Sequence, residues 1–310
     1  MTFINSKITL ILEFLNARAN TSSEEAVRRL VSVNRRKGPS KPPSHLYKEF
    51  DIEKILDKGD DGTQTWMYVL RQRGGNIKKG SILYLHGGAY ILTASPYHWR
   101  FAAALARLTH LTIIVPLYPL APEFTAVHTL LSAKKALQLA AREAGCVKQV
   151  VIVGGSAGGG LSLALTQSLL QNGEETPCAL ELICPFIDAR LDSEEISKLA
   201  NDDPMNSPIG LEIAAKWYSK DVSSPLVSPV LGNLENLPPI PLWIGTRDII
   251  YPQCRKFKDT LSHLKCPLRR YREAKGMMHH WPVIDLLGHP EAKLTTLEIP
   301  NSITDDLLNI

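Results

Sequence analysis

The sequence predicts an α/β fold built on a mainly parallel sheet. From residue 81 onward, short apolar runs alternate with segments of helical spacing, and this alternation is typical of βαβ units. One run, Val150 to Val153, leads directly into a glycine cluster and a further helical segment. The chain has 310 residues of which 44% are hydrophobic, enough to bury a large core. No internal repeat interrupts this pattern.

The expected elements can be placed along the chain from periodicity. Two alternating runs, around Phe50 to Ile55 and Trp66 to Leu70, flank the turn Asp61-Gly62 and predict an antiparallel pair. The later strands and helices follow in turn. We expect strands at 81–85, 111–117, 150–153, 179–184, 240–245 and 267–272, and helices at 98–108, at 127–143 and after Ser156.

Two further segments are not needed for a sheet. Residues 5–18 have helical spacing, and a second helix is predicted to open with the capping box Ser22-x-x-Glu25. Residues 188–238 contain five prolines and a helical patch around Leu211 to Tyr218, which is long for a plain connection. We interpret both segments as parts of a helical cap.

This reading divides the chain into three parts. Residues 1–45 are predicted to form N-terminal cap helices, and residues 188–238 a cap insertion. Residues 46–187 and 239–310 together form the sheet domain, which carries the candidate catalytic residues described below.

Composition narrows the classes of function. The net charge of +4 is spread along the chain and does not favour nucleic acid as a partner. The five cysteines lack metal-ligand spacing, and their odd number argues against a disulfide framework, so a reducing compartment is expected. No stretch approaches the roughly 20 apolar residues of a membrane span. We therefore expect a soluble, cytoplasmic protein without a metal site.

A candidate nucleophile lies where the run 150–153 ends. Gly154-x-Ser156-x-Gly158 has the G-x-S-x-G pattern of a strained strand-to-helix turn that exposes a serine. Glycines at the flanking positions remove side chains that would clash in so tight a turn. The amides at the start of the following helix would point toward the reaction centre.

A glycine loop follows an earlier predicted strand. His86-Gly87-Gly88-Ala89 comes directly after residues 82–85. Hydrolysis of an ester passes through an oxyanion, which preorganised amide donors stabilise by about 3 kcal/mol each. We predict an oxyanion hole formed by the amides of Gly87, Gly88 and Ala157. For His86 we expect a structural role, in which it fixes the loop by hydrogen bonding.

The acid and the base follow the serine in sequence. Asp248 comes after the predicted strand 240–245, and His279 comes after the last predicted strand. Carboxyl ends of strands in open α/β sheets are where sites gather. Ser156, Asp248 and His279 would then act as nucleophile, orienting acid and general base. His280 is expected to bond locally or to line the pocket mouth.

These motifs together resemble the hormone-sensitive-lipase-like branch of the α/β-hydrolases, the bacterial family IV type. The resemblance rests on His86-Gly87-Gly88-Ala89, Tyr118-Pro119-Leu120-Ala121-Pro122-Glu123, Gly154 to Gly159, and the loops of Asp248 and His279. It implies the α/β-hydrolase fold, a mostly parallel eight-stranded sheet flanked by helices with a helical cap. It also implies hydrolysis of carboxylic esters with short to medium acyl chains, without a cofactor.

Two positions depart from that family's pattern, and several functions stay open. Ala89 replaces a third loop glycine, and Gly155 replaces a residue that is commonly acidic. The leading hypothesis is a serine carboxylesterase acting on a small-molecule ester. The alternatives are a deacetylase or amidase for acetylated sugars or other natural products, and a non-catalytic ligand-binding protein. The expected state is monomer or homodimer.

Overall fold

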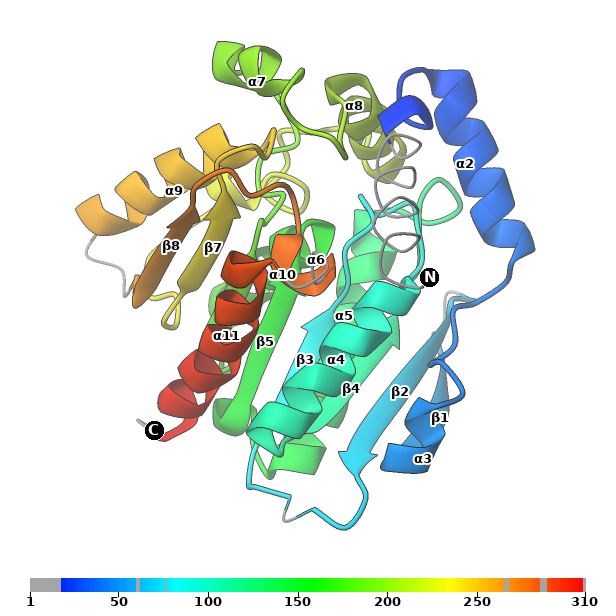
Figure 1. Ribbon diagram of the computed structural model, residues 1–310, viewed down its shortest axis with the longest axis vertical. Helices are drawn as coiled ribbons and strands as arrows, with labels where there is room; N and C mark the ends of the chain where they lie inside the picture. The colour runs from blue at the N-terminus through cyan, green and yellow to red at the C-terminus, as the bar shows by residue number, and fades with distance from the viewer. Residues whose placement is uncertain (1–17, 60–61, 76, 265–267, 285–288, 309–310) are drawn as a thin grey trace.

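An eight-stranded sheet forms the centre of the molecule (Figure 1). The computed structural model describes residues 18–59, 62–75, 77–264, 268–284 and 289–308, and the helix predicted at 5–18 lies almost entirely outside them. The strands are β1 (Phe50–Lys58), β2 (Gln64–Gln72), β3 (Ser81–Leu85), β4 (Thr112–Leu117), β5 (Val150–Gly155), β6 (Ala179–Ile183), β7 (Pro241–Gly245) and β8 (Arg270–Ala274).

The strand order confirms the predicted fold class. Neighbours across the sheet run β1-β2-β4-β3-β5-β6-β7-β8. The predicted antiparallel pair is β1 with β2, and β2 also pairs antiparallel with β4. Every other pairing is parallel. Chain order reverses around β3 and β5, and ligands of open α/β sheets bind beyond the carboxyl ends of strands at such a point.

Helices cover both faces of the sheet (Figure 1). Helices α4 and α11 pack together on one face, and α5 packs beside α6 on the other. The main helices of this domain are α3 (Leu46–Glu49), α4 (Pro96–Thr109), α5 (Ala126–Ala144), α6 (Ala157–Gln171), α9 (Tyr251–His263), α10 (Trp281–Ile284) and α11 (Pro290–Leu308).

The remaining helices gather beyond one end of the sheet (Figure 1). They are α2 (Glu24–Arg36), α7 (Glu194–Leu199) and α8 (Pro208–Tyr218), and α2 contacts α8 although they are far apart in sequence. The hydroxyl of Ser207 donates to the carbonyl of Thr21 at 2.6 Å, which joins the two segments. The predicted N-cap was wrong by one residue, because Ser23 rather than Ser22 accepts from the Ala26 amide.

Arg35 fastens the end of α2 to the sheet domain. Its guanidinium donates to both carboxylate oxygens of Glu123, at 3.0 and 2.9 Å. It also donates to the carbonyls of Ile91 and Ala121, at 2.9 and 2.8 Å. One side chain therefore ties α2 to the loops that follow β3 and β4, as a planar donor fork allows.

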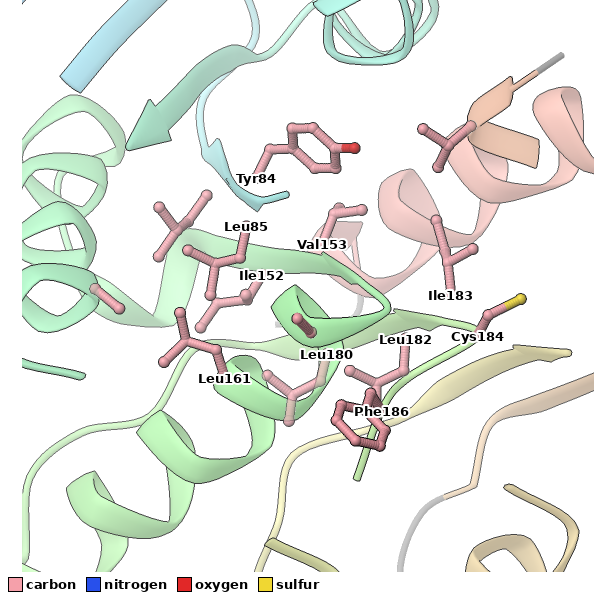
Figure 2. Packing of buried hydrophobic residues seen from close by; sticks show 14 of the residues in the cluster. Tyr84, Leu85, Ile152, Val153, Leu161, Leu180, Leu182, Ile183, Cys184 and Phe186 are labelled. Atoms are coloured by element: carbon pink, nitrogen blue, oxygen red, sulfur yellow. The ribbon is translucent and has the colours of Figure 1, made fainter. Parts of the chain in front are cut away.

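The core lies around the central strands. Every residue of β3, β4, β5 and β6 is buried, as expected for parallel strands covered on both faces. Buried side chains of β3, β5 and β6 belong to the same cluster as Leu161 of α6 and Phe186 (Figure 2). The turn between β5 and α6 is consequently held from several sides.

Candidate active site

Ser156 occupies the turn between β5 and α6 in a strained backbone conformation, with φ 54° and ψ −120°. A non-glycine residue in this region requires a surrounding structure that holds it there. The Ser156 amide donates to the carbonyl of Ile183 at 2.9 Å, and the Ser156 carbonyl accepts from the amides of Gly159 and Phe186 at 2.9 Å each. The neighbouring strand β6 and helix α6 therefore fix the serine.

The glycines around Ser156 are required by close approach. A Cβ at Gly158 would lie 2.0 Å from the carbonyl oxygen of Leu85 at the end of β3. A Cβ at Gly154 would lie 2.2 Å from the hydroxyl of Ser162. The first residue of the pattern is thus needed for contact with α6, and the last for contact between α6 and β3.

Three predicted side chains meet in a hydrogen-bonded chain. Nε2 of His279 lies 2.9 Å from Oγ of Ser156, and Nδ1 of His279 lies 2.7 Å from Oδ2 of Asp248. Asp248 follows β7, and His279 lies in the loop after β8. The three residues are buried, and Ser156 retains 7% exposure. This geometry is that of a nucleophile, a base and an orienting acid.

The surroundings of His279 increase its basicity. Burial alone lowers the pKa of an imidazole. Here the charge of Asp248, the hydrogen bond to it and the charge of Asp203 outweigh burial, and the pKa of His279 is raised above its ordinary value of 6.5. A base of this kind accepts the serine proton only while it is neutral.

The glycine loop lies beside Ser156, and its residues differ in what they can offer. Gly88 and Ala89 line the same cavity as Ser156. The Gly87 amide instead donates to Nε2 of His98 at 3.3 Å, so it must give up this bond before it can serve an oxyanion. Ala89, where the sequence departs from the family's third loop glycine, was not among the three predicted donors, yet it lines the cavity beside Gly88.

His86 lies inside the loop and is fully buried. Its ring stacks on Tyr118 with centroids 4.2 Å apart, and the Tyr118 hydroxyl donates to the His86 carbonyl at 2.6 Å. Burial lowers the pKa of His86 to about 4, although a hydrogen bond with Gly87 opposes it. A neutral ring that anchors the loop agrees with the expected structural role. Tyr118 supports this ring by stacking and by its hydrogen bond to the His86 carbonyl.

His280 packs against Gly155 and Gly87 and lines the same cavity as Ser156. A Cβ at Gly155 would lie 2.0 Å from Nε2 of His280, and one at Gly87 would lie 2.8 Å from Cε1. The departure at Gly155 therefore makes room for this imidazole. Burial, followed by the charges of His279 and other histidines, lowers the pKa of His280 well below its ordinary value. His280 is consequently a neutral ring.

The serine opens into a cavity of about 340 Å³. No Asp, Glu, Lys or Arg is among the described residues that line it. The walls come from the glycine loop, from the histidine loop and from both candidate cap segments: Thr21, Leu30, Gly88, Ala89, Ile91, Leu92, Ser95, Tyr97, His98, Met205, Asn206, Ser207, Gly210, Leu211, His279, His280, Val283 and Ile284. Such a cavity suits an uncharged, largely apolar group.

One group of potential metal ligands occurs among the described residues. The ligand atoms of Cys184, Asp248 and His279 lie within 4.8 Å of one another. Two of these residues already bond each other in the triad. Burial and the charge of Asp248 raise the pKa of the Cys184 thiol well above its ordinary value, which disfavours the thiolate that metals prefer.

Comparison with known proteins identifies the family of this chain. The model of a family described as having the alpha/beta hydrolase fold matches residues 82–283, which include all three members of the hydrogen-bonded chain. The chain belongs to the α/β-hydrolase family. Within the residues that the structure describes, this hydrolase has no helix long and apolar enough to cross a membrane.

Relatives of this hydrolase are named as esterases and acetyl-hydrolases. It is 35% identical to a candidate acetyl-hydrolase, LipR, of Mycobacterium tuberculosis, over 69% of each chain. It is 28% identical to an esterase of Acinetobacter venetianus, over 75% of this chain and 78% of that one. Among solved structures, a candidate esterase from Staphylococcus aureus matches with a TM-score of 0.82 and 26% identity, covering 93% of this chain and 95% of that one.

Proposed function

We propose that this hydrolase is a serine carboxylesterase that cleaves short-chain carboxylic esters through an acyl-enzyme intermediate. The observation that supports it most is the hydrogen-bonded chain from Asp248 through His279 to Ser156, which ends in an uncharged cavity. The esterase and acetyl-hydrolase names of its relatives point to the same chemistry. No cofactor enters this proposal.

The mechanism follows from the contacts. Nε2 of His279 removes the proton from Ser156 as Oγ attacks the ester carbonyl, and Asp248 stabilises the imidazolium that forms. Amides of Gly88 and Ala157 receive the oxyanion, with Gly87 or its neighbour Ala89 as a third donor. His279 then protonates the leaving alcohol. Water attacks the acyl-enzyme by the same route and releases the acid.

The cavity sets the proposed substrate class. About 340 Å³ of largely apolar space, closed by residues 18–45 and by the insertion 188–238, suits acyl groups of about two to six carbons. We propose that these two segments act as the cap. The small-molecule ester is the proposed partner, and a monomer or homodimer is the proposed state. The four described cysteines are free, which supports a cytoplasmic location.

The decisive experiment compares Ser156→Ala with wild type on p-nitrophenyl esters. We expect hydrolysis to fall by about 10⁴-fold or more, as on loss of a triad member. Ser168→Ala, in the same helix α6, is the matched control and should retain the wild-type rate. Circular dichroism checks the fold of each variant.

The substrate range tests the alternatives. Acyl chains of about two to twelve carbons, an acetylated-sugar series and anilides would be compared by kcat/KM. A kcat/KM that keeps rising through the long chains contradicts the short pocket, because each added methylene gains roughly 0.8 kcal/mol only where there is room.

More than a tenth of the activity left in Ser156→Ala would refute the assignment of the nucleophile. No turnover of any ester, amide or acetyl substrate by wild type would favour a binding protein.

A further inference from the structure

Asp203 is a buried carboxylate of the insertion 188–238, fully shielded from solvent, that the triad does not use. Both of its oxygens accept hydrogen bonds. Oδ1 accepts from the amides of Met205 and Asn206 at 2.8 and 3.0 Å. Oδ2 accepts from the amide of Ile249 at 2.9 Å and from the Asn206 side chain at 3.3 Å. Four N–H donors on one carboxyl group are the pattern of an ionised acceptor.

The bond to Ile249 reaches the turn that carries the catalytic acid. Ile249 directly follows Asp248. Oδ1 of Asp248 in turn accepts a hydrogen bond from the amide of Ile250 at 3.1 Å. On the other side of Asp248, the guanidinium of Arg247 donates to the carbonyl of Asp202 at 3.1 Å. Residues 202 and 203 of the insertion therefore accept hydrogen bonds from both chain neighbours of Asp248, Arg247 and Ile249.

The same carboxylate shapes the cavity. Met205, Asn206 and Ser207 all line it, and the first two donate their amides to Asp203. The side chain thus joins a wall of the cavity to the turn of the catalytic acid.

The charge of Asp203 also acts on the base. Burial, followed by the charge of Asp248, raises the pKa of Asp203, while His279 and the amide bonds oppose this rise. In return Asp203 adds to the negative field that favours the charged form of His279. His280 and Cys184, the other titratable neighbours, have pKa values shifted toward their neutral forms. Among the described residues, Asp248 and Asp203 are the two whose charges raise the pKa of His279.

We propose that Asp203 is a positioning residue of the cap insertion: it holds the turn of Asp248 in place and contributes, with Asp248, to the field at His279. This proposal rests on the proposed function only for the catalytic role of the triad. The hydrogen bond to Ile249 and the electrostatic field at the imidazole of His279 are independent of the proposed function.

Asp203→Asn tests the proposal, with Asp202→Asn as the matched control. The side-chain amide of Asn has only one acceptor oxygen, so the hydrogen bonds to one of the two carboxylate oxygens are lost together with the negative charge. Asp202 is exposed and takes part through its carbonyl, which the control leaves intact. The titration of His279 is read by NMR of ¹³C-labelled histidine, beside the pH dependence of kcat/KM on p-nitrophenyl butyrate.

We expect Asp203→Asn to lower the pKa of His279, to move the acid limb of kcat/KM to lower pH, and to reduce kcat by about ten- to hundredfold through misplacement of the acid. Asp202→Asn should leave all three unchanged. If Asp203→Asn leaves the His279 titration at its wild-type position, or if Asp202→Asn moves it equally, the proposal is overturned. Loss of stability without a shift in the titration would also overturn it.

Two further measurements keep the test decisive. If Asp203→Asn does not fold, Asp203→Ser, which is smaller and also neutral, must show the same displaced titration. In wild type, the Ile249 amide proton must exchange slowly with solvent. Rapid exchange in the folded protein would contradict the hydrogen bond from this amide to Asp203. If wild type hydrolyses no ester, the proposed function fails, while the histidine titration and the Ile249 exchange still decide the role of Asp203.

Discussion

At the scale of single residues, the site depends on where each side chain can point. Ser156 adopts a φ of 54°, which turns its hydroxyl out of the sheet toward His279. His279 and His280 are sequence neighbours, but only His279 bonds Ser156 and Asp248, whereas His280 packs on Gly155. The proposed base is therefore His279, and the next residue is a neutral ring that packs against the turn of Ser156.

Variants of the two histidines test this assignment. His279→Ala should reduce kcat by at least about 10³-fold, because no group remains to take the serine proton. His280→Ala should cost less than about tenfold, because it removes a neutral ring that takes no part in proton transfer. Both rates are measured at one pH with the fold checked by circular dichroism. The reverse ranking of the two variants would place the base one residue later.

The pH dependence of activity follows from the raised pKa of His279. Its charged form accumulates below that pKa, and the charged imidazole cannot accept a proton from Ser156, so kcat/KM falls as the pH drops through the pKa. Because the carboxylates raise the pKa, the fall begins at a higher pH than for an ordinary histidine. A kcat/KM profile measured between about pH 5 and 9 on the folded enzyme checks this, and a flat profile would contradict it.

Much of this residue-level arrangement could be predicted from short motifs. Ser156 and Asp248 each follow a strand that a continuous apolar run marks, His279 follows the weaker last strand, and strand ends converge at one sheet edge. Asp203 could not be predicted in this way. It precedes a proline within an irregular insertion, and only the folded chain brings it to Ile249. The engagement of Gly87 by His98 is likewise a tertiary contact without a local signal.

At the scale of elements, helix α6 can approach the sheet only because its first turn is built of glycines. A Cβ at Gly158 would meet the main chain of β3, which cannot move aside as the tip of a side chain can. The first turn of α6 therefore lies in direct contact with the end of β3.

Gly158→Ala tests this close approach. We expect it to lower the free energy of unfolding by roughly 3 kcal/mol, the upper end of the range for overpacking, because backbone must shift. Gly75→Ala is the matched control, since its Cβ would meet its nearest neighbour, Gln72, at an ordinary 3.4 Å. Urea unfolding measures both variants, and equal small changes would mean that α6 yields more easily than its contacts indicate.

Element boundaries were predictable where the chain shows strong periodicity. The buried strands β3 to β6 agree with the apolar runs to within a few residues. The last strand was placed too early, at 267–272 instead of Arg270–Ala274, because an edge strand carries charged residues and lacks a continuous apolar run. The N-cap at Ser23 was misplaced because Ser22 and Ser23 are both suitable capping residues.

At the scale of the whole molecule, a buried carboxyl group lies between the sheet and the C-terminal helix. Glu181 of β6 is fully buried and accepts from the indole N–H of Trp243 in β7 at 2.7 Å, while α11 packs on β6. Burial raises the pKa of Glu181 to about 8, and the hydrogen bonds of Ser302 and Trp243 only partly oppose this. The folded protein therefore holds a proton that the unfolded chain releases near its ordinary value of 4.5.

This proton makes stability depend on pH. Between the two pKa values the folded state binds more protons than the unfolded state, so the free energy of unfolding falls as the pH rises. Glu181→Gln removes this titration. The free energy of unfolding of the variant should therefore rise relative to that of wild type by at most about 1.4 kcal/mol per pH unit between the two pKa values. Urea unfolding at several pH values measures the difference, with the exposed Glu175→Gln as control. A difference that does not change with pH would contradict the buried acid.

The triad bonds span long stretches of chain: Ser156 and His279 are 123 residues apart, and Asp248 and His279 are 31 apart. The proposed nucleophile can be activated only after the segments that carry Asp248 and His279 have docked against it, because both partners come from distant parts of the chain. A fluorophosphonate, which reacts only with an activated serine, should therefore count molecules that have finished folding. Sampled during refolding, such labelling would separate completed molecules from compact intermediates that already possess secondary structure but still lack a docked histidine loop.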